Sequence, residues 1–261
     1  MTDFEFLQTE RTEGVLRVSL NRPKANAFNS AMIDEWLQVL KESAREPGVR
    51  CLLLTGSGRF FSAGQDVTAL GQNGGQVSFR AHLQRTYNRV ILRMRQLEKP
   101  IVAAINGPAV GAGLGVALAA DLRLAGQSAS FIYGFTGLGL TADSATSLTL
   151  PLLMGLGRAT EMAFTNHPVS AEQALAWGLV NRVVPDDRLM PEAQALAAEL
   201  AAGPTLAFGL GKRAFNRNFL GDLEGALEYE AQLQEIAGRT EDHRGGLAAF
   251  LEKRQPEFHG R

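Results

Sequence analysis

The sequence predicts an α/β fold whose last fifth is helical. Over the first two thirds of the 261 residues, strand-like segments alternate with segments of helical periodicity, which is typical of a parallel sheet covered by helices. Two runs, residues 49–55, which are apolar apart from Arg50 and Thr55, and Ile101–Ile105, predict strands that are buried on both faces. From Thr205 onward the strand patterns fade, and apolar residues recur every four positions from Leu223 to Ala231.

Local signals place further elements between these landmarks. Val15–Leu20 alternates apolar and polar residues and predicts a strand. Asn29 or Ser30 can cap the helix that follows, and Gly178 can end a later helix that opens with a capping box at Ser170. The other predicted elements are helices over residues 31–45, 79–97 and 111–120, strands over 122–125 and 179–184, and a glycine-rich loop at 71–76.

The composition is that of an ordinary globular protein. The 26 basic and 27 acidic residues give a net charge of −1, which provides no general attraction to nucleic acid. Cys51 has no partner for a disulfide within the chain, and the start lacks a signal-peptide pattern, so we expect a cytoplasmic protein. The longest uncharged run, 100–120, is interrupted by Asn106 and several glycines, and therefore predicts buried strand, loop and helix rather than a membrane span. We expect a core at 1–200 and a helical region at 201–261, either in the same domain or as a small appendage.

Several common catalytic signatures are absent from the sequence. No serine lies in a Gly-x-Ser-x-Gly motif, and no glycine-rich loop of the phosphate-binding type is present. The four histidines, His82, His167, His243 and His259, are scattered singly, which favours surface or core histidines over metal ligands. We therefore expect no metal site.

Residues 111–115, Gly-Ala-Gly-Leu-Gly, lie between a predicted strand and a predicted helix, and three interpretations are open. The dinucleotide-binding fingerprint needs its third glycine one residue later and an acidic residue about twenty positions on, and neither is present. The glycines could instead allow close helix packing, or leave backbone amides exposed to an anionic group. Residues 61–66 also follow a buried strand, so two loops on neighbouring strands could aim two amides at one oxygen, as in an oxyanion hole.

Four motifs occur together along nearly the whole chain. They are residues 21–29 (NRPKANAFN), 61–66 (FSAGQD), 100–107 (PIVAAING) followed by 111–113 (GAG), and 250–258 (FLEKRQPEF). In type and order they resemble the enoyl-CoA hydratase/isomerase (crotonase) superfamily. The resemblance implies a spiral of ββα units with a C-terminal helical region that makes trimer contacts, in a homotrimer or a homohexamer of two trimers. It also implies an acyl-CoA thioester substrate, with CoA as part of the substrate and no metal or redox cofactor.

The resemblance also implies roles for individual residues. The backbone amides of Gln65 and Ala112 match the pair that polarises the thioester carbonyl, and fixed amides can stabilise an enolate without reorganisation. Ala63 and Asp66 match positions near the adenine of CoA, and Lys24 matches a position that contacts the CoA phosphates.

Two further pairs of positions bear on the assignment. Lys253 and Arg254 match residues that bind the nucleotide 3′-phosphate, although a solvated basic helix end is an equally simple interpretation. Hydratases of this superfamily use two glutamates, and this sequence has Gly115 and Phe135 at those places. Because adding water to a double bond needs paired acid and base groups, the resemblance does not favour a hydratase of the usual kind.

One carboxylate remains near these motifs. The stretch Leu-Gly-Leu-Thr-Ala-Asp that ends at Asp143 resembles the phenylacetate-pathway isomerase subgroup, whose members isomerise ring-epoxide phenylacetyl-CoA and whose relatives shift double bonds in unsaturated acyl-CoAs. Asp143 could also cap a helix, and the two roles are compatible. We expect a pocket of Tyr133, Phe135, Leu138 and the 71–90 segment to desolvate Asp143 and raise its pKa, with plain core packing as the alternative for the aromatic residues.

These observations predict an acyl-CoA isomerase in which a single base, Asp143, moves a proton between two carbons of a thioester enolate. Two alternatives stay open. One is a hydratase or thioester hydrolase of the same superfamily that uses other groups. The other is a non-catalytic member that binds acyl-CoA or RNA, although the balanced charge and the absence of a basic aromatic stripe argue against nucleic acid as a partner.

Overall fold

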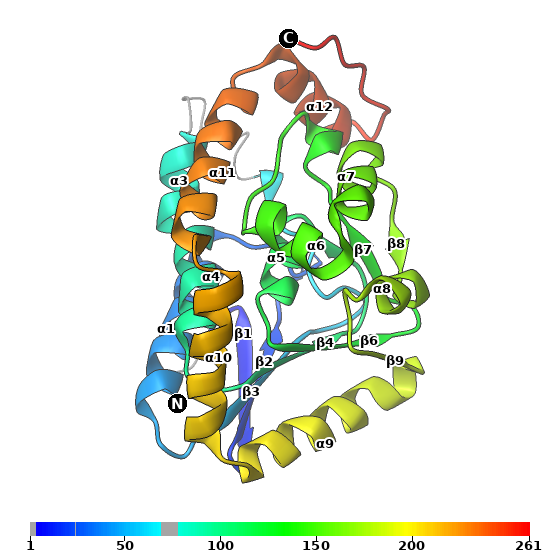
Figure 1. The fold of residues 1–261 in the computed structure, drawn as a ribbon. Helices are drawn as coiled ribbons and strands as arrows, with labels where there is room; N and C mark the ends of the chain where they lie inside the picture. Colours follow the sequence, from blue (N-terminus) through cyan, green and yellow to red (C-terminus); the bar gives the residue numbers. More distant parts are fainter. Residues whose placement is uncertain (1–3, 24, 69–77) are drawn as a thin grey trace.

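The computed structural model describes residues 4–23, 25–68 and 78–261 (Figure 1). Lys24 and the glycine-rich loop predicted at 71–76 lie outside the described residues. None of the helices within the described ranges is both long enough and apolar enough to cross a membrane.

Two sheets organise the first two thirds of the chain. In the larger sheet the first pair of strands is antiparallel and each later pair is parallel. Its order is β1 (Leu7–Thr12), β2 (Val15–Leu20), β3 (Cys51–Gly56), β4 (Ile101–Ile105), β6 (Leu122–Gly126) and β9 (Arg182–Val184). The smaller sheet has the order β5 (Ala109–Val110), β7 (Ser130–Ile132) and β8 (Val169–Ser170).

Helices cover both faces of the larger sheet. Figure 1 shows α9 (Leu189–Ala202) along one face, with most of the other helices on the opposite side. Besides α9, the described helices are α1 (Ser30–Arg45), α3 (Phe79–Arg85), α4 (Tyr87–Gln96), α5 (Ala112–Leu118), α6 (Thr146–Met154), α7 (Leu156–Thr165), α8 (Ala171–Trp177), α10 (Thr205–Phe219), α11 (Leu223–Ala237) and α12 (Glu241–Leu251). The 3₁₀ turns are η1 (Thr136–Leu138) and η2 (Asp186–Arg188).

The central strand β3 is buried on both faces, as its continuous apolar run predicts. Leu52 and Leu54 belong to the main core beneath α1, α4 and α5. Cys51 and Leu53 face the other way and pack against the alanine-rich side of α9. Because alternate side chains of a strand point to opposite faces, a strand between two helical layers must be apolar at every position.

Several predicted boundaries are confirmed and others are wrong. Asn29 caps α1, and its side chain accepts a hydrogen bond from the amide of Met32 at 2.9 Å. The single helix predicted over 79–97 is two helices, because the backbone at Thr86 leaves the helical region (φ −114°, ψ −95°). The strand predicted over 179–184 forms only from Arg182, since the amide of Leu179 is still bonded to the end of α8.

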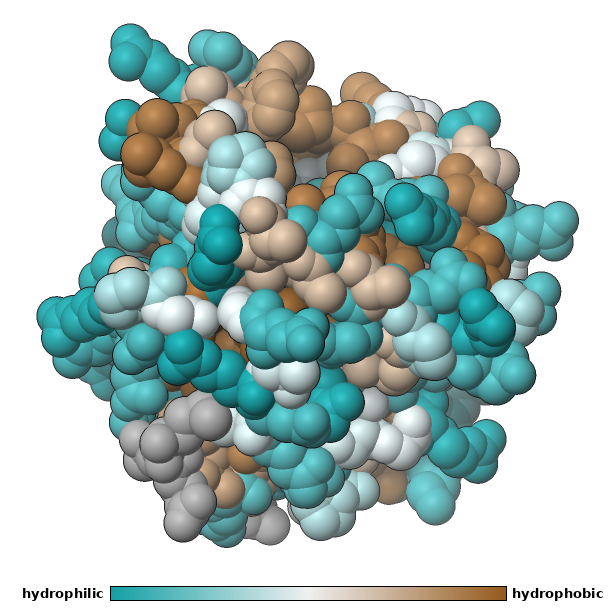
Figure 2. All heavy atoms as spheres, turned by 90° about the horizontal axis from the view of Figure 1, so that it is seen from below, coloured by the Kyte–Doolittle hydropathy of each residue, from teal (hydrophilic) through white to brown (hydrophobic). Residues whose placement is uncertain are grey.

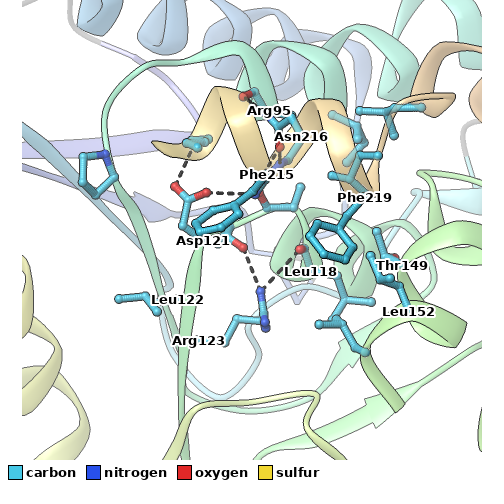
Figure 3. Close-up of a pocket in the computed structure, with 18 of the residues that line it drawn as sticks. Arg95, Leu118, Asp121, Leu122, Arg123, Thr149, Leu152, Phe215, Asn216 and Phe219 are labelled. Carbon is cyan, nitrogen blue, oxygen red and sulfur yellow. Dashed lines mark hydrogen bonds and ion pairs between the residues drawn. The ribbon is translucent and has the colours of Figure 1, made fainter. Parts of the chain in front are cut away.

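The start of β6 is tied to α4 and α10 by a largely buried charge network. Asp121 accepts hydrogen bonds from Arg95 and from Lys212, each at 2.9 Å (Figure 3). Beside this network lies an apolar cavity of about 510 Å³ bordered by Phe215 and Phe219 of α10. None of the residues predicted to bind or act on a substrate lines this cavity.

Large apolar side chains remain exposed in the second half of the chain, mainly on α7 and α10–α12. Figure 2 shows brown apolar patches between teal polar residues on one face of the molecule. The most exposed large apolar side chains in the described part of the chain are Leu156, Phe164, Leu206, Phe215, Phe219, Tyr229 and Ile236.

Candidate active site

A cavity of about 360 Å³ lies where the loop after β3 meets the start of α5. Its wall combines residues that are far apart in the sequence, contributed by the loop after β3, α3–α5, the segment around η1, and α11 and α12. Of the residues predicted to form the site, the wall contains Ala63, Gln65, Ala112, Phe135, Leu138 and Asp143.

Two backbone amides in this wall have no hydrogen-bond acceptor among the residues that the structure describes. The amide of Phe28 donates to the carbonyl of Gly64 at 2.7 Å, and the amide of Asp66 donates to the carbonyl of Phe28 at 2.9 Å. This parallel bridge directs the amide of Gln65 away from Phe28. Neither the Gln65 amide nor the Ala112 amide, which opens α5, donates a hydrogen bond to any residue within the described ranges.

The two loops approach so closely that residue 64 must be glycine. Gly64 has φ +81°, and a Cβ atom there would lie 2.6 Å from the carbonyl oxygen of Val110 and 3.4 Å from the amide nitrogen of Ala112. The backbone just before Gln65 is therefore packed directly against the backbone just before α5. This contact places the two free amides side by side in one wall, as an oxyanion hole requires.

Asp143 is the acidic group of this cavity and is only 7% exposed. Ser144 Oγ donates to its Oδ1 at 2.7 Å, and Gln234 Nε2 donates to its Oδ2 at 3.2 Å. Burial raises the pKa of Asp143 to about 7, the hydrogen bonds from Ser144 and Gln234 oppose this rise, and the negative charge of Glu230 adds to it. The carboxyl group is therefore poised to exchange a proton near neutral pH.

The structure corrects the alternative role of Asp143 as a helix cap. The residue that precedes α6 is Ala145, and the side chain of Asp143 does not bond the amides at the start of this helix. Glu230 of α11 accepts hydrogen bonds from the amides of Ala145 and Ser147 instead, each at 2.8 Å. Ser144 and Ala145 both have positive φ (56° and 62°), which is costly for residues other than glycine, so Glu230 holds a strained turn next to Asp143.

Sequence reasoning missed Glu230 and Gln234, and it indicated His82 and Tyr87 only as members of the 71–90 segment, whose described part does contribute to the wall. Glu230 and Gln234 lie on the buried face of α11, and polar residues on an otherwise apolar helical stripe are the signal that could have indicated them. His82, which we expected to be a surface or core histidine, borders the cavity, as does Tyr87. The sequence carried no spacing signal for these two, because the break between α3 and α4 decides which way they face.

Other predicted site residues lie off the cavity. Asp66 forms an ion pair with Arg22 at 2.7 Å. Burial favours a higher pKa for Asp66, but hydrogen bonds from Thr68 and Arg22 outweigh it and hold the pKa below its usual range. Tyr133 is buried and packs edge-on against Phe135, with ring centroids 4.9 Å apart, so Phe135 rather than Tyr133 contributes to the wall.

The basic pair predicted to bind the CoA phosphate lies beyond the end of α12. Lys253 and Arg254 are both exposed, and Arg254 forms an ion pair with Glu252 at 2.6 Å. Neither residue lines the cavity. Their predicted role stays a prediction.

The two positions where hydratases of the superfamily carry glutamates have different environments. A Cβ atom at Gly115 would lie 2.4 Å from the Cβ of Ser144 and 2.8 Å from its carbonyl oxygen, so no side chain fits there. Phe135 is part of the apolar wall. Among the described residues that line the cavity, Asp143 is the single carboxylate.

The part of the chain that the structure describes contains no group of three or more His, Cys, Asp or Glu side chains that could hold a metal ion. The described wall of the cavity offers two unbonded amides, one carboxyl group of raised pKa and the polar side chains beside them.

Comparison with known proteins agrees with this geometry. Residues 10–261 match the family model described as enoyl-CoA hydratase/isomerase. The 1,2-epoxyphenylacetyl-CoA isomerase of Escherichia coli K12 is 40% identical over 260 residues, covering 98% of this chain and 99% of that protein. A probable enoyl-CoA hydratase of Rhodobacter capsulatus is 38% identical over 259 residues, covering 99% of each.

A solved structure shares the fold. The crystal structure of an enoyl-CoA hydratase from Mycobacterium avium subsp. paratuberculosis superposes with a TM-score of 0.89 at 32% identity, covering 98% of this chain and 100% of that one. The crotonase-type α/β fold with a helical C-terminal region, expected from the motifs, is thereby confirmed.

The contact between Gly115 and Ser144 gives a stability prediction. We expect Gly115→Ala to lower the free energy of unfolding by about 1–3 kcal/mol, because the added methyl group overlaps Ser144. Gly157→Ala, on exposed α7 where a Cβ meets nothing within 4 Å, should be neutral or stabilising by up to about 1 kcal/mol. Urea denaturation of both variants checks this. Equal stability of the two variants would show that the Ser144 turn does not press on α5.

Proposed function

The chain belongs to the enoyl-CoA hydratase/isomerase family, and we propose that within this family it is an acyl-CoA isomerase. The substrate is an acyl-CoA thioester whose double bond, or ring epoxide, is rearranged without net addition or loss of atoms. CoA enters as part of the substrate, and the proposed reaction draws on no other cofactor. The similarity to a protein named 1,2-epoxyphenylacetyl-CoA isomerase supports this choice.

The proposed reaction uses the amides and the carboxylate in sequence. The thioester oxygen accepts hydrogen bonds from the amides of Gln65 and Ala112. Asp143, as carboxylate, takes a proton from the α-carbon of a 3-enoyl thioester, and the electron pair becomes an enolate whose negative oxygen the two amides stabilise. The protonated Asp143 then returns the proton to the γ-carbon, and the double bond moves into conjugation with the thioester.

We favour an isomerase over a hydratase because of the number of carboxylates in the cavity. A hydratase must both activate water and protonate the adjacent carbon, so it needs two acid/base groups placed around the water. An isomerase returns the same proton and needs one group. Asp143 is the single carboxylate among the described cavity residues, and Gly115 has no room for a second.

Replacement of the proposed base tests the mechanism. Asp143→Asn keeps the size of the side chain and removes its basicity, so kcat for 3-enoyl-CoA isomerisation should fall about 10²- to 10⁴-fold. Binding of a saturated acyl-CoA should change little, which serves as the control for folding. Products are read by mass and by double-bond position: a gain of water indicates hydration, release of free CoA indicates hydrolysis, and unchanged mass indicates isomerisation. Full activity of Asp143→Asn would remove this residue from the reaction.

The raised pKa of Asp143 predicts the pH profile. The base must be ionised, and its pKa is about 7, so kcat/KM should fall about tenfold for each pH unit below about 7 and level off above it. Glu230→Gln removes a negative charge that raises this pKa, and should move the acid limb to lower pH. The check is a series of initial rates with a 3-enoyl-CoA across pH. An acid limb near the ordinary aspartate pKa would contradict an ionising group in a buried site.

We also propose that copies of the chain associate as a homotrimer or as a hexamer of two trimers. The exposed apolar residues on α7 and α10–α12 support association, because single soluble chains rarely leave large apolar surface uncovered.

Sedimentation velocity tests the assembly. The wild-type chain should sediment as a trimer or hexamer, and Phe215→Ser should shift it toward smaller species, because Phe215 is 66% exposed on α10 of the single chain. Arg213→Ser, an exposed polar site on the same helix, is the matched control and should leave the assembly unchanged. A wild-type monomer would contradict the proposal.

A further inference from the structure

Gln234 is a polar side chain of the core that the proposed reaction does not use. It lies on α11, is only 1% exposed and lines the cavity. Its Nε2 donates to Oδ2 of Asp143 at 3.2 Å, and its Oε1 accepts a hydrogen bond from the backbone amide of Thr141 at 3.3 Å. Because a backbone N–H can only donate, the contact with Thr141 fixes the NH₂ group of Gln234 as the end that faces Asp143.

The same helix holds the chain on both sides of Asp143. Glu230, one helical turn before Gln234, accepts hydrogen bonds from the amides of Ala145 and Ser147. Residues four positions apart share a face of a helix, so one buried face of α11 bonds the segment before and after Asp143. Glu230 bonds the backbone beside the proposed base, and Gln234 bonds its carboxyl group directly.

The carboxyl group of Asp143 is held from two sides. Ser144 Oγ donates to Oδ1 from the turn that packs against Gly115, and Gln234 donates to Oδ2 from the wall of the cavity. The torsion that turns an aspartate carboxyl group is soft, so the side chain by itself does not fix the direction of its oxygens. With one donor on each oxygen, the carboxyl group cannot turn without breaking both hydrogen bonds.

The hydrogen bond from Gln234 also favours the ionised form of Asp143. A donor bonds a negatively charged oxygen more strongly than a neutral one, whereas burial and the charge of Glu230 favour the protonated form. An apolar side chain of the same length could fill the space of Gln234, but it would leave Oδ2 without this donor. The polar residue at this core position therefore serves Asp143 and not packing.

We propose that Gln234 is a positioning residue, which holds the carboxyl group of Asp143 in the orientation that reaches the acyl chain. The inference rests on the proposed function for the role of Asp143 as the base. Gln234 acts through Asp143 and transfers no proton itself. Its loss should therefore affect proton transfer more than binding of the substrate.

The other titratable groups that act on Asp143 within the described ranges stay in place when Gln234 is replaced. They are Glu230 of α11, Tyr87 of α4 and Tyr133, which follows β7. Burial raises the pKa of Tyr87 well above its usual range and that of Tyr133 to about 12, so both side chains are neutral near pH 7. A change in the titration of Asp143 on replacing Gln234 therefore reports on the contact between these two residues.

Titration of Asp143 in the ligand-free protein tests this contact without turnover. Difference infrared spectra against Asp143→Asn isolate the carboxyl band of Asp143, and their pH dependence gives its pKa. Gln234→Met keeps the length of the side chain and removes the donor, so the pKa of Asp143 should rise by about one pH unit from its wild-type value of about 7. Gln232→Met, exposed on the same helix, is the matched control and should leave this pKa unchanged.

Kinetics with a 3-enoyl-CoA test the positioning role. In Gln234→Met we expect kcat to fall about tenfold or more while KM stays within about twofold, because the base is misplaced and the substrate contacts remain. The acid limb of kcat/KM should move to higher pH together with the pKa of Asp143. Gln234→Glu keeps an acceptor for Thr141 and replaces only the donor, so it should move the limb in the same direction and decides the question if Gln234→Met does not fold.

The possible failures of the two proposals are distinct. The inference about Gln234 is overturned if neither variant changes the pKa of Asp143, or if the rate falls equally at every pH, as a purely structural role would give. Full activity of Asp143→Asn would refute the proposed base and the positioning role with it. An inactive Asp143→Asn together with an unchanged pKa of Asp143 in the Gln234 variants would overturn the positioning role alone.

Discussion

Two backbone segments, the loop after β3 and the entry to α5, touch each other with no side chain between them. This contact exists because residue 64 is glycine with φ +81°, and any Cβ there would meet the carbonyl of Val110 at 2.6 Å. The bridge between Phe28 and Gln65 then occupies the neighbouring backbone groups but leaves the Gln65 amide unbonded within the described ranges. Backbone amides held in this way cannot turn toward another acceptor, which is what the proposed stabilisation of a negative oxygen requires. The proposed chemistry depends on this contact more than on any single side chain.

The proposed reaction also requires a carboxyl group, that of Asp143, which is shielded from water and lies in the same cavity as those amides. Because burial raises the pKa of Asp143, folding favours its protonated form. The resulting contribution to stability is complete below the ordinary pKa of 3.8 and is lost as pH rises through about 7. The adjacent turn adds strain at Ser144 and Ala145. Glu230 offsets part of this strain by accepting two amides at the start of α6, while its negative charge adds to the raised pKa of Asp143. It thereby ties helix α11 to the proposed base. The helical last fifth of the chain thus contributes to the wall of the cavity, in addition to the association proposed for it.

Much of the fold follows from local patterns. Strands β2, β3 and β4 were predictable because alternation or continuous apolarity reports directly on how many faces are buried. The capping box at Ser170 and the stop at Gly178 bound α8 as predicted, since both are short-range backbone effects. The break at Thr86, the short β9 and the strand β1 escaped prediction, because tertiary contacts and not local propensity decide them.

The sequence by itself determined the family, the two glycine-containing loops and the presence of one acidic residue, Asp143, at the right distance along the chain. Those features are local, so a motif can carry them. Only the tertiary structure decided that Asp143 is not a helix cap and that Tyr133 lies behind Phe135. It also decided that Gln234 and His82 line the cavity and that Glu230 holds the turn after Asp143. These residues come from segments up to about ninety positions away from Asp143, and no periodicity within a segment encodes which side chains of another segment it will face once both are buried.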